Sequence, residues 1–396
     1  MAIFQVGDLM KKRIVIHTAD WHLGKNRKYT DYLDQQRLML EAIVKIVREI
    51  LEQNPGCDIW FLMCGDIFDR NEHTDRHEFV LPIMTILYPL QDLERQYENF
   101  SWYWIDGNHD RQPHDPTDPN AMVSVLSPLI PMIGDHLVVQ HPRWIEDKSL
   151  LLVPFGQWTV DQILEMLQKW PSEFLVMHEC CAGITTDVGW KPPRDQDRYI
   201  DVGELLEGSP GLKAVFLGDI HRCQSLDSKG ISWYSGSPIT LDHGHKMPKG
   251  LLIHHFVDDN GWRRQGSPEL RSILNYVPGL KFHSQLGILD QPDKIPFDVL
   301  SKHSGQYLQF TVTSEVYALI HRQIPDLFES PQVSFDHVVD ADEKLSSSVD
   351  TPSEESTLSY YESLIHQWIL ENGQELTKKE REIVLARIVK DFESRN

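Results

Sequence analysis

The sequence has few cysteines, no long apolar run and a shortage of basic residues. Its five cysteines are an odd number without CxxC spacing, which argues against a disulfide framework or a thiolate zinc site. No stretch approaches the ~18 apolar residues of a membrane span, and the N-terminal MAIFQVGDLMKKR is too short and too polar for a signal peptide. We therefore expect a cytoplasmic protein with no membrane partner.

Acidic residues far outnumber basic ones. The 59 aspartates and glutamates against 38 lysines and arginines give a net charge of -21. Non-specific coating of duplex DNA depends on lysine and arginine neutralising phosphates, so this balance argues against a general DNA-coating protein. It does not exclude nucleic acid, because carboxylates that hold divalent cations become locally cationic, and an acidic protein can still carry a basic groove.

The length predicts more than one structural unit. A chain of 396 residues with 41% hydrophobic and 24% charged residues is typical of a globular protein built from two or three units. Residues 13–258 alternate strand and helix patterns and form the expected first unit. Residues 270–339 form a smaller α+β unit, with strands expected over 306–312 and 332–339 and a helix over 315–323.

The C-terminal part has a different character. Residues 340–355 are acidic, serine-rich and free of aromatic residues, which is typical of a flexible linker. Residues 356–396 predict two short helices, the second opening on a capping-box pattern of Thr377 and Glu380. Two helices alone cannot bury both of their apolar stripes, so this helical pair implies a binding partner.

Two amphipathic helices are expected in the first unit, over residues 34–53 and 74–93. The second is slightly too apolar for a solvated outer face. The simpler interpretation is that this helix packs against the core. The more specific alternative is that it forms a homodimer contact.

Polar residues follow the expected strands of the first unit. The aromatic strand over 100–105 runs into Gly107-Asn108-His109-Asp110, a combination that a plain core does not need. Strands over 13–18, 58–64, 173–177 and 213–217 end in the same way. Together these strand ends supply Asp20, His22, Asp66, Asn108, His178, Asp219 and His221.

These side chains are of the types that hold hard divalent cations, and paired ions ~3.5 to 4 Å apart can clamp a phosphate and its attacking water. Asp20/His22 and Asp219/His221 both have Asp-x-His spacing, which places the two side chains on one face of an extended segment. A lone histidine at a strand end is more often only hydrogen bonded, but five such motifs together predict a metal centre. Residues 242–245 also have His-x-His spacing and are interpreted as a rim loop, because no strong strand precedes them.

At these motifs the chain resembles the calcineurin-like metallophosphoesterases. His17-Thr18-Ala19-Asp20-Trp21-His22-Leu23-Gly24-Lys25, Gly65-Asp66-Ile67-Phe68-Asp69 and Gly107-Asn108-His109-Asp110 are similar to the SbcD family of nuclease subunits and to the eukaryotic meiotic recombination nuclease. The resemblance implies an α/β fold: a two-layer β-sandwich flanked by helices, with a small capping domain and a C-terminal helical pair. It also implies two manganese ions, with magnesium as the alternative, and cleavage of DNA phosphodiesters.

The resemblance assigns roles to the motif residues. One ion would be held by Asp20, His22, Asp66 and His221, and the other by Asp66, Asn108, His178 and Asp219, so that Asp66 bridges them. His109 would face the phosphate as a proton or hydrogen-bond donor. The chain departs from the family at Gly218-Asp219-Ile220-His221, where the usual motif is Gly-His-x-His. A carboxylate can also ligate manganese.

The resemblance also gives the later segments a function. Residues 270–339 would cap the active site and shape a DNA groove, and residues 356–396 would bind the coiled-coil base of an SbcC-type ATPase. Five basic residues near the motifs are candidate DNA contacts, although each is as readily a solvated surface charge: Lys25, Arg27, Lys28, Arg70 and Arg111.

Three functions fit these patterns: a manganese-dependent DNA exonuclease and endonuclease, a phosphoesterase acting on small molecules or proteins, and a non-catalytic scaffold that recruits the ATPase. The linker and helical pair favour the first over the second, since a phosphomonoesterase has no need of them. Retention of the ligands and His109 argues against the third.

Overall fold

The computed structural model describes twelve segments of the chain. They are residues 11–25, 32–69, 83–115, 118–139, 141–186, 199–241, 248–259, 261–276, 282–289, 306–312, 314–324 and 333–338. Several predictions lie outside these residues: the linker 340–355, the helical pair 356–396, the rim loop 242–245, and the basic residues Arg27, Lys28 and Arg70.

The first large sheet contains seven strands in the order β14-β13-β1-β2-β3-β6, with β15 also paired to β13. Strands β1, β2, β3 and β6 run parallel, and β13 runs antiparallel to β1. The strand bounds are β1 (Lys11–Thr18), β2 (Asp58–Cys64), β3 (Phe100–Ile105), β6 (Leu137–Val138), β13 (Leu251–Asp258), β14 (Trp262–Arg264) and β15 (Glu269–Arg271).

The second large sheet contains six strands in the order β11-β12-β10-β9-β8-β7. Its four central strands, β8, β9, β10 and β12, run parallel to one another. The bounds are β7 (Arg143–Ile145), β8 (Leu150–Val153), β9 (Phe174–His178), β10 (Ala214–Gly218), β11 (Gln224–Ser225) and β12 (Ser232–Tyr234).

Alternate residues of the strands point to different layers of the core. In β1, Ile14 and Ile16 pack in a cluster with the outer helices, whereas Val15 packs in the cluster between the two sheets. Leu150 and Phe216 of the second sheet join that inner cluster, as expected for two sheets packed face to face. Burial on both faces explains why the parallel strands are continuous apolar runs.

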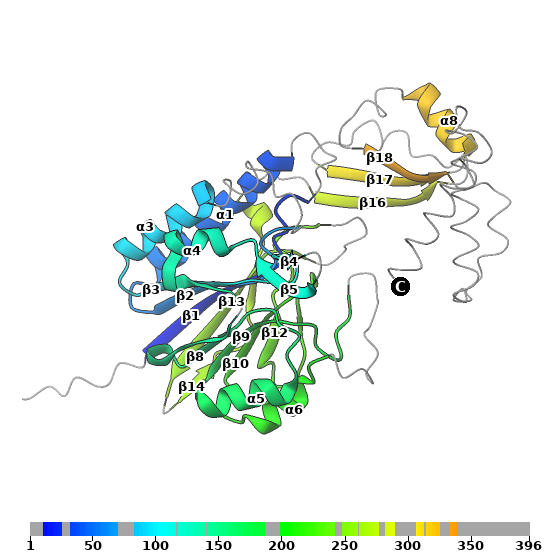
Figure 1. The fold of residues 1–396 in the computed structure, drawn as a ribbon. Helices are drawn as coiled ribbons and strands as arrows, with labels where there is room; N and C mark the ends of the chain where they lie inside the picture. The colour runs from blue at the N-terminus through cyan, green and yellow to red at the C-terminus, as the bar shows by residue number, and fades with distance from the viewer. Residues whose placement is uncertain are drawn as a thin grey trace, which may run out of the picture. The chain divides into compact units, whose positions relative to one another are not determined.

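Helices cover the outer face of each sheet (Figure 1). Residues of α1 (Tyr32–Gln53) and α3 (Tyr88–Gln96) pack on the first sheet, and residues of α5 (Val160–Lys169) and α6 (Val202–Gly208) pack on the second. The expected two-layer β-sandwich flanked by helices is therefore confirmed. Shorter helical turns are α4 (Ile130–Ile133), η2 (Ser127–Leu129), η3 (Gly134–His136), η4 (Glu146–Lys148) and η5 (Ile273–Asn275).

The helix expected over residues 74–93 differs in its described part. A π-helical turn, η1 (Ile83–Leu87), precedes α3, which extends to Gln96. Pro89 lies in the first turn of α3 and has no N–H with which to continue the helical ladder from the preceding turn. The homodimer contact through this segment stays a prediction.

Two smaller groups of elements complete the described chain. Strands β4 (Arg111–Asp115) and β5 (Asp118–Ser124) pair with each other. Strands β16 (Phe282–Leu289), β17 (Gln306–Val312) and β18 (Val333–Val338) form a parallel sheet, and α8 (Ser314–Gln323) connects the last two. The capping role of residues 270–339 stays a prediction. Among the described residues, no helix has the length and apolar character needed to cross a membrane.

Candidate metal centre

Polar side chains follow five parallel strands at the end where the two sheets meet. At the end of β9, Nδ1 of His178 donates a 2.7 Å hydrogen bond to the Cys64 carbonyl at the end of β2. The Asp219 N–H, after β10, donates to Oδ1 of Asp20, after β1, at 3.0 Å. These cross-sheet bonds bring together all seven predicted ligands: Asp20, His22, Asp66, Asn108, His178, Asp219 and His221.

The backbone is strained where these side chains are carried. Asp20, His22, Asp66 and Asp219 have positive φ angles of 55°, 47°, 58° and 101°. Non-glycine residues rarely adopt such angles, and they persist only where the surroundings over-determine them. Here the Asp20 N–H donates to the Gly65 carbonyl at 3.0 Å and the His22 N–H to the Asp66 carbonyl at 3.1 Å. The first two strand ends therefore hold each other in this conformation.

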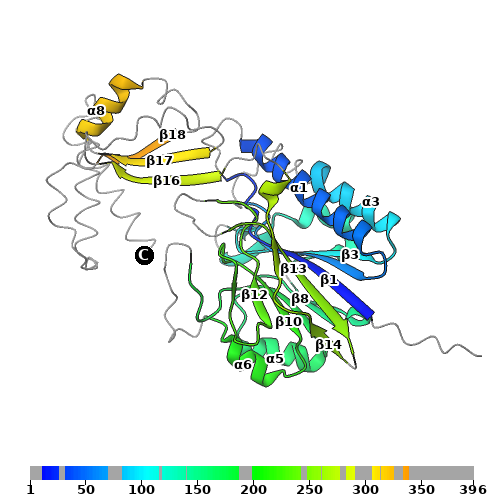
Figure 2. The ribbon, with the colours of Figure 1, turned by 180° about the vertical axis from the view of Figure 1, so that it is seen from behind.

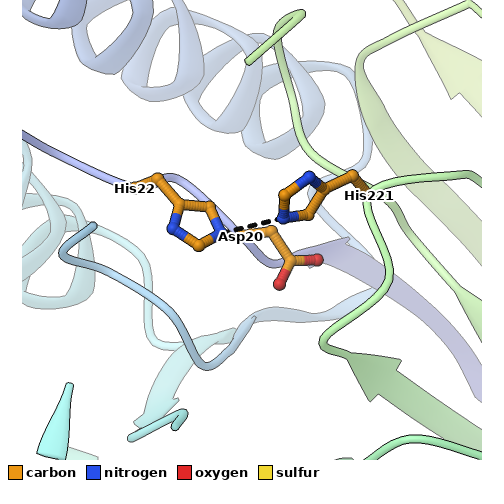
Figure 3. A group of neighbouring side chains, drawn as sticks. All are labelled: Asp20, His22 and His221. Carbon is orange, nitrogen blue, oxygen red and sulfur yellow. Dashed lines mark hydrogen bonds between the residues drawn. The ribbon is translucent and has the colours of Figure 1, made fainter. Parts of the chain in front are cut away.

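Asp20, His22 and His221 form the first group of side chains (Figure 3). The Nε2 atoms of His22 and His221 lie 2.9 Å apart, facing each other. Asp20 and His22 are buried, and Oδ2 of Asp20 has no hydrogen-bond partner among the described residues. Because a buried carboxylate oxygen without a partner is costly, this group fits a bound cation.

Asp66, Asn108 and Asp219 form the second group, around Nε2 of His178. This atom lies 2.9 Å from Oδ1 of Asn108, 3.3 Å from Oδ1 of Asp66 and 3.9 Å from Oδ1 of Asp219. Burial opposes the charged form of His178, but the Asp66 and Asp219 carboxylates raise its pKa well above the usual value. Nδ1–H is committed to the Cys64 carbonyl, so Nε2 is the atom that carries either this second proton or, in the neutral ring, a lone pair. A lone pair that faces three oxygens requires a proton or a metal ion among them, so this group also fits a cation.

Asp66 faces both groups. Its Oδ1 lies 3.3 Å from Nε2 of His178, and its Oδ2 lies 3.5 Å from Nε2 of His22. This is the geometry that a bridging carboxylate requires. Burial raises the pKa of Asp66, but the imidazoles of His178, His22 and His109 outweigh burial and hold that pKa below its usual value. Asp66 is therefore an ionised carboxylate at neutral pH.

The other two carboxylates are destabilised as anions. Burial raises the pKa of Asp20 and of Asp219, and the nearby Asp66 carboxylate raises both further. A divalent cation would relieve both the burial cost and the mutual repulsion of the three carboxylates. Nitrogen and oxygen donors without a thiolate suit manganese or magnesium better than a structural zinc ion.

The sequence carries a family signature over the same residues. A model of the family described as calcineurin-like phosphoesterase matches residues 14–223, more than half of the 396-residue chain. The chain belongs to the calcineurin-like phosphoesterase family. All seven predicted ligands lie within the matched residues. The chain is also similar to the SbcD subunit of the nuclease SbcCD from Staphylococcus saprophyticus subsp. saprophyticus, with 22% identity over 318 residues that cover 75% of this chain and 77% of that protein.

In this calcineurin-like phosphoesterase, Asp69 connects the predicted proton donor to the first ligand group. Nδ1 of His109 donates a 2.5 Å hydrogen bond to the Asp69 carbonyl. Oδ1 of Asp69 lies 3.4 Å from Nδ1 of His22, whose ring meets that of His109 edge-on with centroids 4.7 Å apart. Asp69 belongs to a motif that the sequence singles out, but it was not among the predicted site residues. The sequence feature that could have indicated a role for Asp69 is its position three residues after Asp66.

Asp110 is a second residue whose role was not predicted from the sequence. Its buried carboxylate accepts hydrogen bonds from the backbone N–H groups of Ile67, Phe68 and Gly107, at 3.1, 2.9 and 2.9 Å. Burial, with the nearby Asp66 carboxylate, raises the pKa of Asp110 to about 7. Asp110 thus joins the loops that carry Asp66 and Asn108 without facing the ligand groups itself.

Two of the five candidate DNA contacts are described, and both make ion pairs within the chain. Nζ of Lys25 lies 3.8 Å from Oδ1 of Asp69. Arg111 forms a bidentate pair with the buried Asp106, at 3.0 and 3.2 Å. These contacts give both cations a structural role, and their contact with DNA stays a prediction.

Asp219 departs from the family motif, so we predict the effect of replacing it. Its Oδ1 lies 3.9 Å from Nε2 of His178, too far for a hydrogen bond and suited to two groups that share an ion. Asp219→Ala should therefore weaken binding of the ion in the second group, while Asp219→His restores the family's usual donor and retains binding. Titration of both variants with Mn²⁺, followed by electron paramagnetic resonance, measures the stoichiometry and affinity.

Asp219→Asn is the matched control, because asparagine tolerates the positive φ angle of 101° and removes only the charge. A carboxylate that acted from outside the ligand shell would typically change affinity or activity ~10 to 100-fold and leave the stoichiometry intact. Two ions bound by the alanine variant at unchanged affinity would remove Asp219 from the ligand set.

Proposed function

We propose that this protein is the manganese-dependent DNA nuclease subunit of an SbcCD-type complex that processes DNA ends in recombination and repair. The observation that carries the proposal is the similarity to the SbcD subunit of an SbcCD nuclease over 75% of the chain, in a phosphoesterase whose strand ends converge on two Asp/His groups. A phosphodiester in DNA is the substrate that this similarity favours over a phosphomonoester.

The two groups of side chains would hold two ions in the arrangement that the resemblance implies. Bound there, the ions would polarise the phosphate and activate the attacking water. Asp66 would serve both ions, because one of its oxygens faces each group. The remaining ligands would be Asp20, His22 and His221 for one ion, and Asn108, His178 and Asp219 for the other.

His109 would supply the proton for the departing oxygen. The bond from Nδ1–H to the Asp69 carbonyl fixes the orientation of the ring and leaves Nε2 as its only other titratable atom. As an imidazolium, His109 can transfer the Nε2 proton to the leaving group and is left with the Nδ1–H that Asp69 already binds. His109 is half-buried, so this proton can be replaced from solvent.

The assay that tests this proposal compares substrates. Purified full-length protein with Mn²⁺ should cleave labelled linear duplex DNA, circular single strands and a chromogenic phosphodiester, and should act far more slowly on the matching phosphomonoester. The linear and circular substrates separate exonuclease from endonuclease activity. Rapid turnover of the phosphomonoester with intact DNA would favour a small-molecule or protein phosphatase instead, and no hydrolysis of any substrate would favour a scaffold.

The proposed complex has further parts that rest on the sequence. Residues 270–339 would cap the site, residues 74–93 would contact a second copy of the chain, and residues 356–396 would bind the ATPase. The cytoplasm is the proposed location. Contacts to DNA from Lys25, Arg27, Lys28, Arg70 and Arg111 belong to the same proposal.

Removal of residues 356–396 should separate catalysis from assembly. The predicted ligands all precede this segment, so the truncated protein should keep its Mn²⁺-dependent hydrolysis of the chromogenic phosphodiester. It should no longer co-purify with a co-expressed SbcC-type ATPase, because the apolar stripes that imply a partner are gone. Retention of the ATPase with unchanged affinity would place the interaction elsewhere in the chain.

A further inference from the structure

Two histidines that belong to neither ligand group are buried between the sheets. His17 lies on β1 and His254 on β13, and these two strands are neighbours in the sheet (Figure 2). Their antiparallel register pairs His17 with Leu252 and Val15 with His254. Both side chains are buried, and their ring centroids lie 5.6 Å apart. Each ring also meets Phe216 of β10 edge-on, at 5.4 Å and 5.1 Å.

The two histidines differ in their hydrogen bonds. Nε2 of His17 lies 3.1 Å from the Leu217 carbonyl, and because a carbonyl oxygen only accepts, Nε2 must carry the proton. Neither ring nitrogen of His254 has a hydrogen-bond partner among the described residues. The same core therefore holds one imidazole that joins the two sheets and one that fills space between them.

The bond from His17 joins strands that carry ligands of the metal centre. On β1, His17 precedes Asp20 by three residues, and on β10, Leu217 precedes Asp219 by two and His221 by four. The cross-sheet bonds from His178 and Asp219 both use a residue of the ligand set. The bond from His17 to Leu217 uses none, so it connects the sheets independently of whether the ligands are engaged.

Packing alone does not explain a histidine at this position. An imidazole between two apolar sheets must give up its hydration, and burial lowers the pKa of His17 to about 3, so the ring is neutral at physiological pH. A phenylalanine or leucine would fill the space without that cost. What the imidazole adds is a directional bond to a carbonyl of the opposite sheet.

We propose that His17 is a positioning residue for the metal centre, whose hydrogen bond to the Leu217 carbonyl sets the spacing between the strand ends that carry Asp20 and His221. This inference rests on the proposed metal centre. Asp20 and Asp219, just beyond the bond, have positive φ angles of 55° and 101°. Such strained ends persist only where the surrounding structure over-determines them, and a fixed separation of the strands beneath them adds to the backbone bonds that hold them. Without the bond, the first ligand group should lose its alignment while the sandwich remains folded.

Substitutions of His17 and His254 in the full-length protein test this role. Gln places its amide N–H near the position of Nε2 and can still donate to Leu217, whereas Asn is too short and mimics Nδ1. His17→Phe and His17→Asn should weaken Mn²⁺ binding ~10 to 100-fold, the usual effect of losing a group that orients ligands. His17→Gln should recover most of this affinity. His254→Phe is the matched control in the same core. Because His254 orients no ligand, the Mn²⁺ affinity of this variant should lie within about twofold of that of the wild type.

Two readouts separate positioning from general stability: Mn²⁺ affinity by electron paramagnetic resonance, and the urea midpoint of the metal-free protein. The inference would be overturned if His17→Phe and His254→Phe lost Mn²⁺ affinity equally, each in proportion to the fall of its urea midpoint. It would also be overturned if His17→Asn bound Mn²⁺ with wild-type affinity. If His17→Phe does not fold, the comparison of Asn with Gln decides. A wild-type protein that binds no Mn²⁺ would overturn the proposed metal centre and this inference with it.

Discussion

Exhaustive removal of divalent cations should abolish phosphodiester cleavage, and Mn²⁺ should restore it. The groups around His22 and His178 contain only nitrogen and oxygen donors, and the family to which the chain belongs uses divalent metals. Such ions can polarise a phosphate and activate the attacking water. The side chains alone offer no replacement, because His109 can move a proton but cannot polarise the phosphate. Cleavage of labelled linear DNA after dialysis against a chelator, and after stepwise addition of Mn²⁺, measures the effect.

Stability provides an independent readout of the same ions. A ligand that binds only the folded protein stabilises it by about 2.7 kcal/mol at 100 times its dissociation constant. Relief of the charge repulsion at the buried Asp20 and the half-buried Asp219 should therefore raise the urea midpoint when Mn²⁺ is added. Mg²⁺ serves as the comparison, since imidazole ligands suit it less well. Cleavage that continues undiminished in chelator, with no response of the urea midpoint to Mn²⁺, would contradict a two-metal centre.

The sequence was most informative where a local pattern had a single structural consequence. Most residues of β1, β2 and β3 are buried, and because both faces of these strands are covered, their apolar residues form continuous runs that the sequence shows directly. Polar residues immediately after such strands must lie at their carboxyl ends. The family resemblance then placed the strands in two sheets. The convergence of Asp20, Asp66 and His178 follows from these facts together.

The sequence was least informative where a role depends on distant partners. His17 precedes a ligand motif and reads as part of a strand, and its bond to Leu217 spans 200 positions of the chain. Asp110 was predicted only as part of its motif, because the three N–H groups that it binds belong to two different loops. Arg111 was a candidate DNA contact because nothing in its neighbours reveals the bidentate pair with Asp106.

His109→Ala should lower the rate of DNA cleavage by roughly 10² to 10⁴ while both ions remain bound, the usual range for a positioned proton donor. The backbone N–H of His109 donates to Oδ1 of Asp66 at 2.9 Å, and this bond survives any side-chain substitution. The ligand groups should therefore keep their geometry. His109→Asn is the more specific test. Its amide N–H can still donate to the Asp69 carbonyl but is too weak an acid to protonate the leaving group.

The alternative is that His109 binds metal. Ligand atoms of His22, Asp69 and His109 all lie within 4.8 Å of one another, so this trio could itself hold an ion. Mn²⁺ stoichiometry of His109→Ala distinguishes the two roles, since a ligand variant should bind fewer ions than the wild type. The leaving group gives a second distinction. A nitrophenolate departs without a proton, so His109→Ala should lose far less activity on a nitrophenyl phosphodiester than on DNA. Equal losses on both substrates would show that His109 acts on the metal centre and not on the departing oxygen.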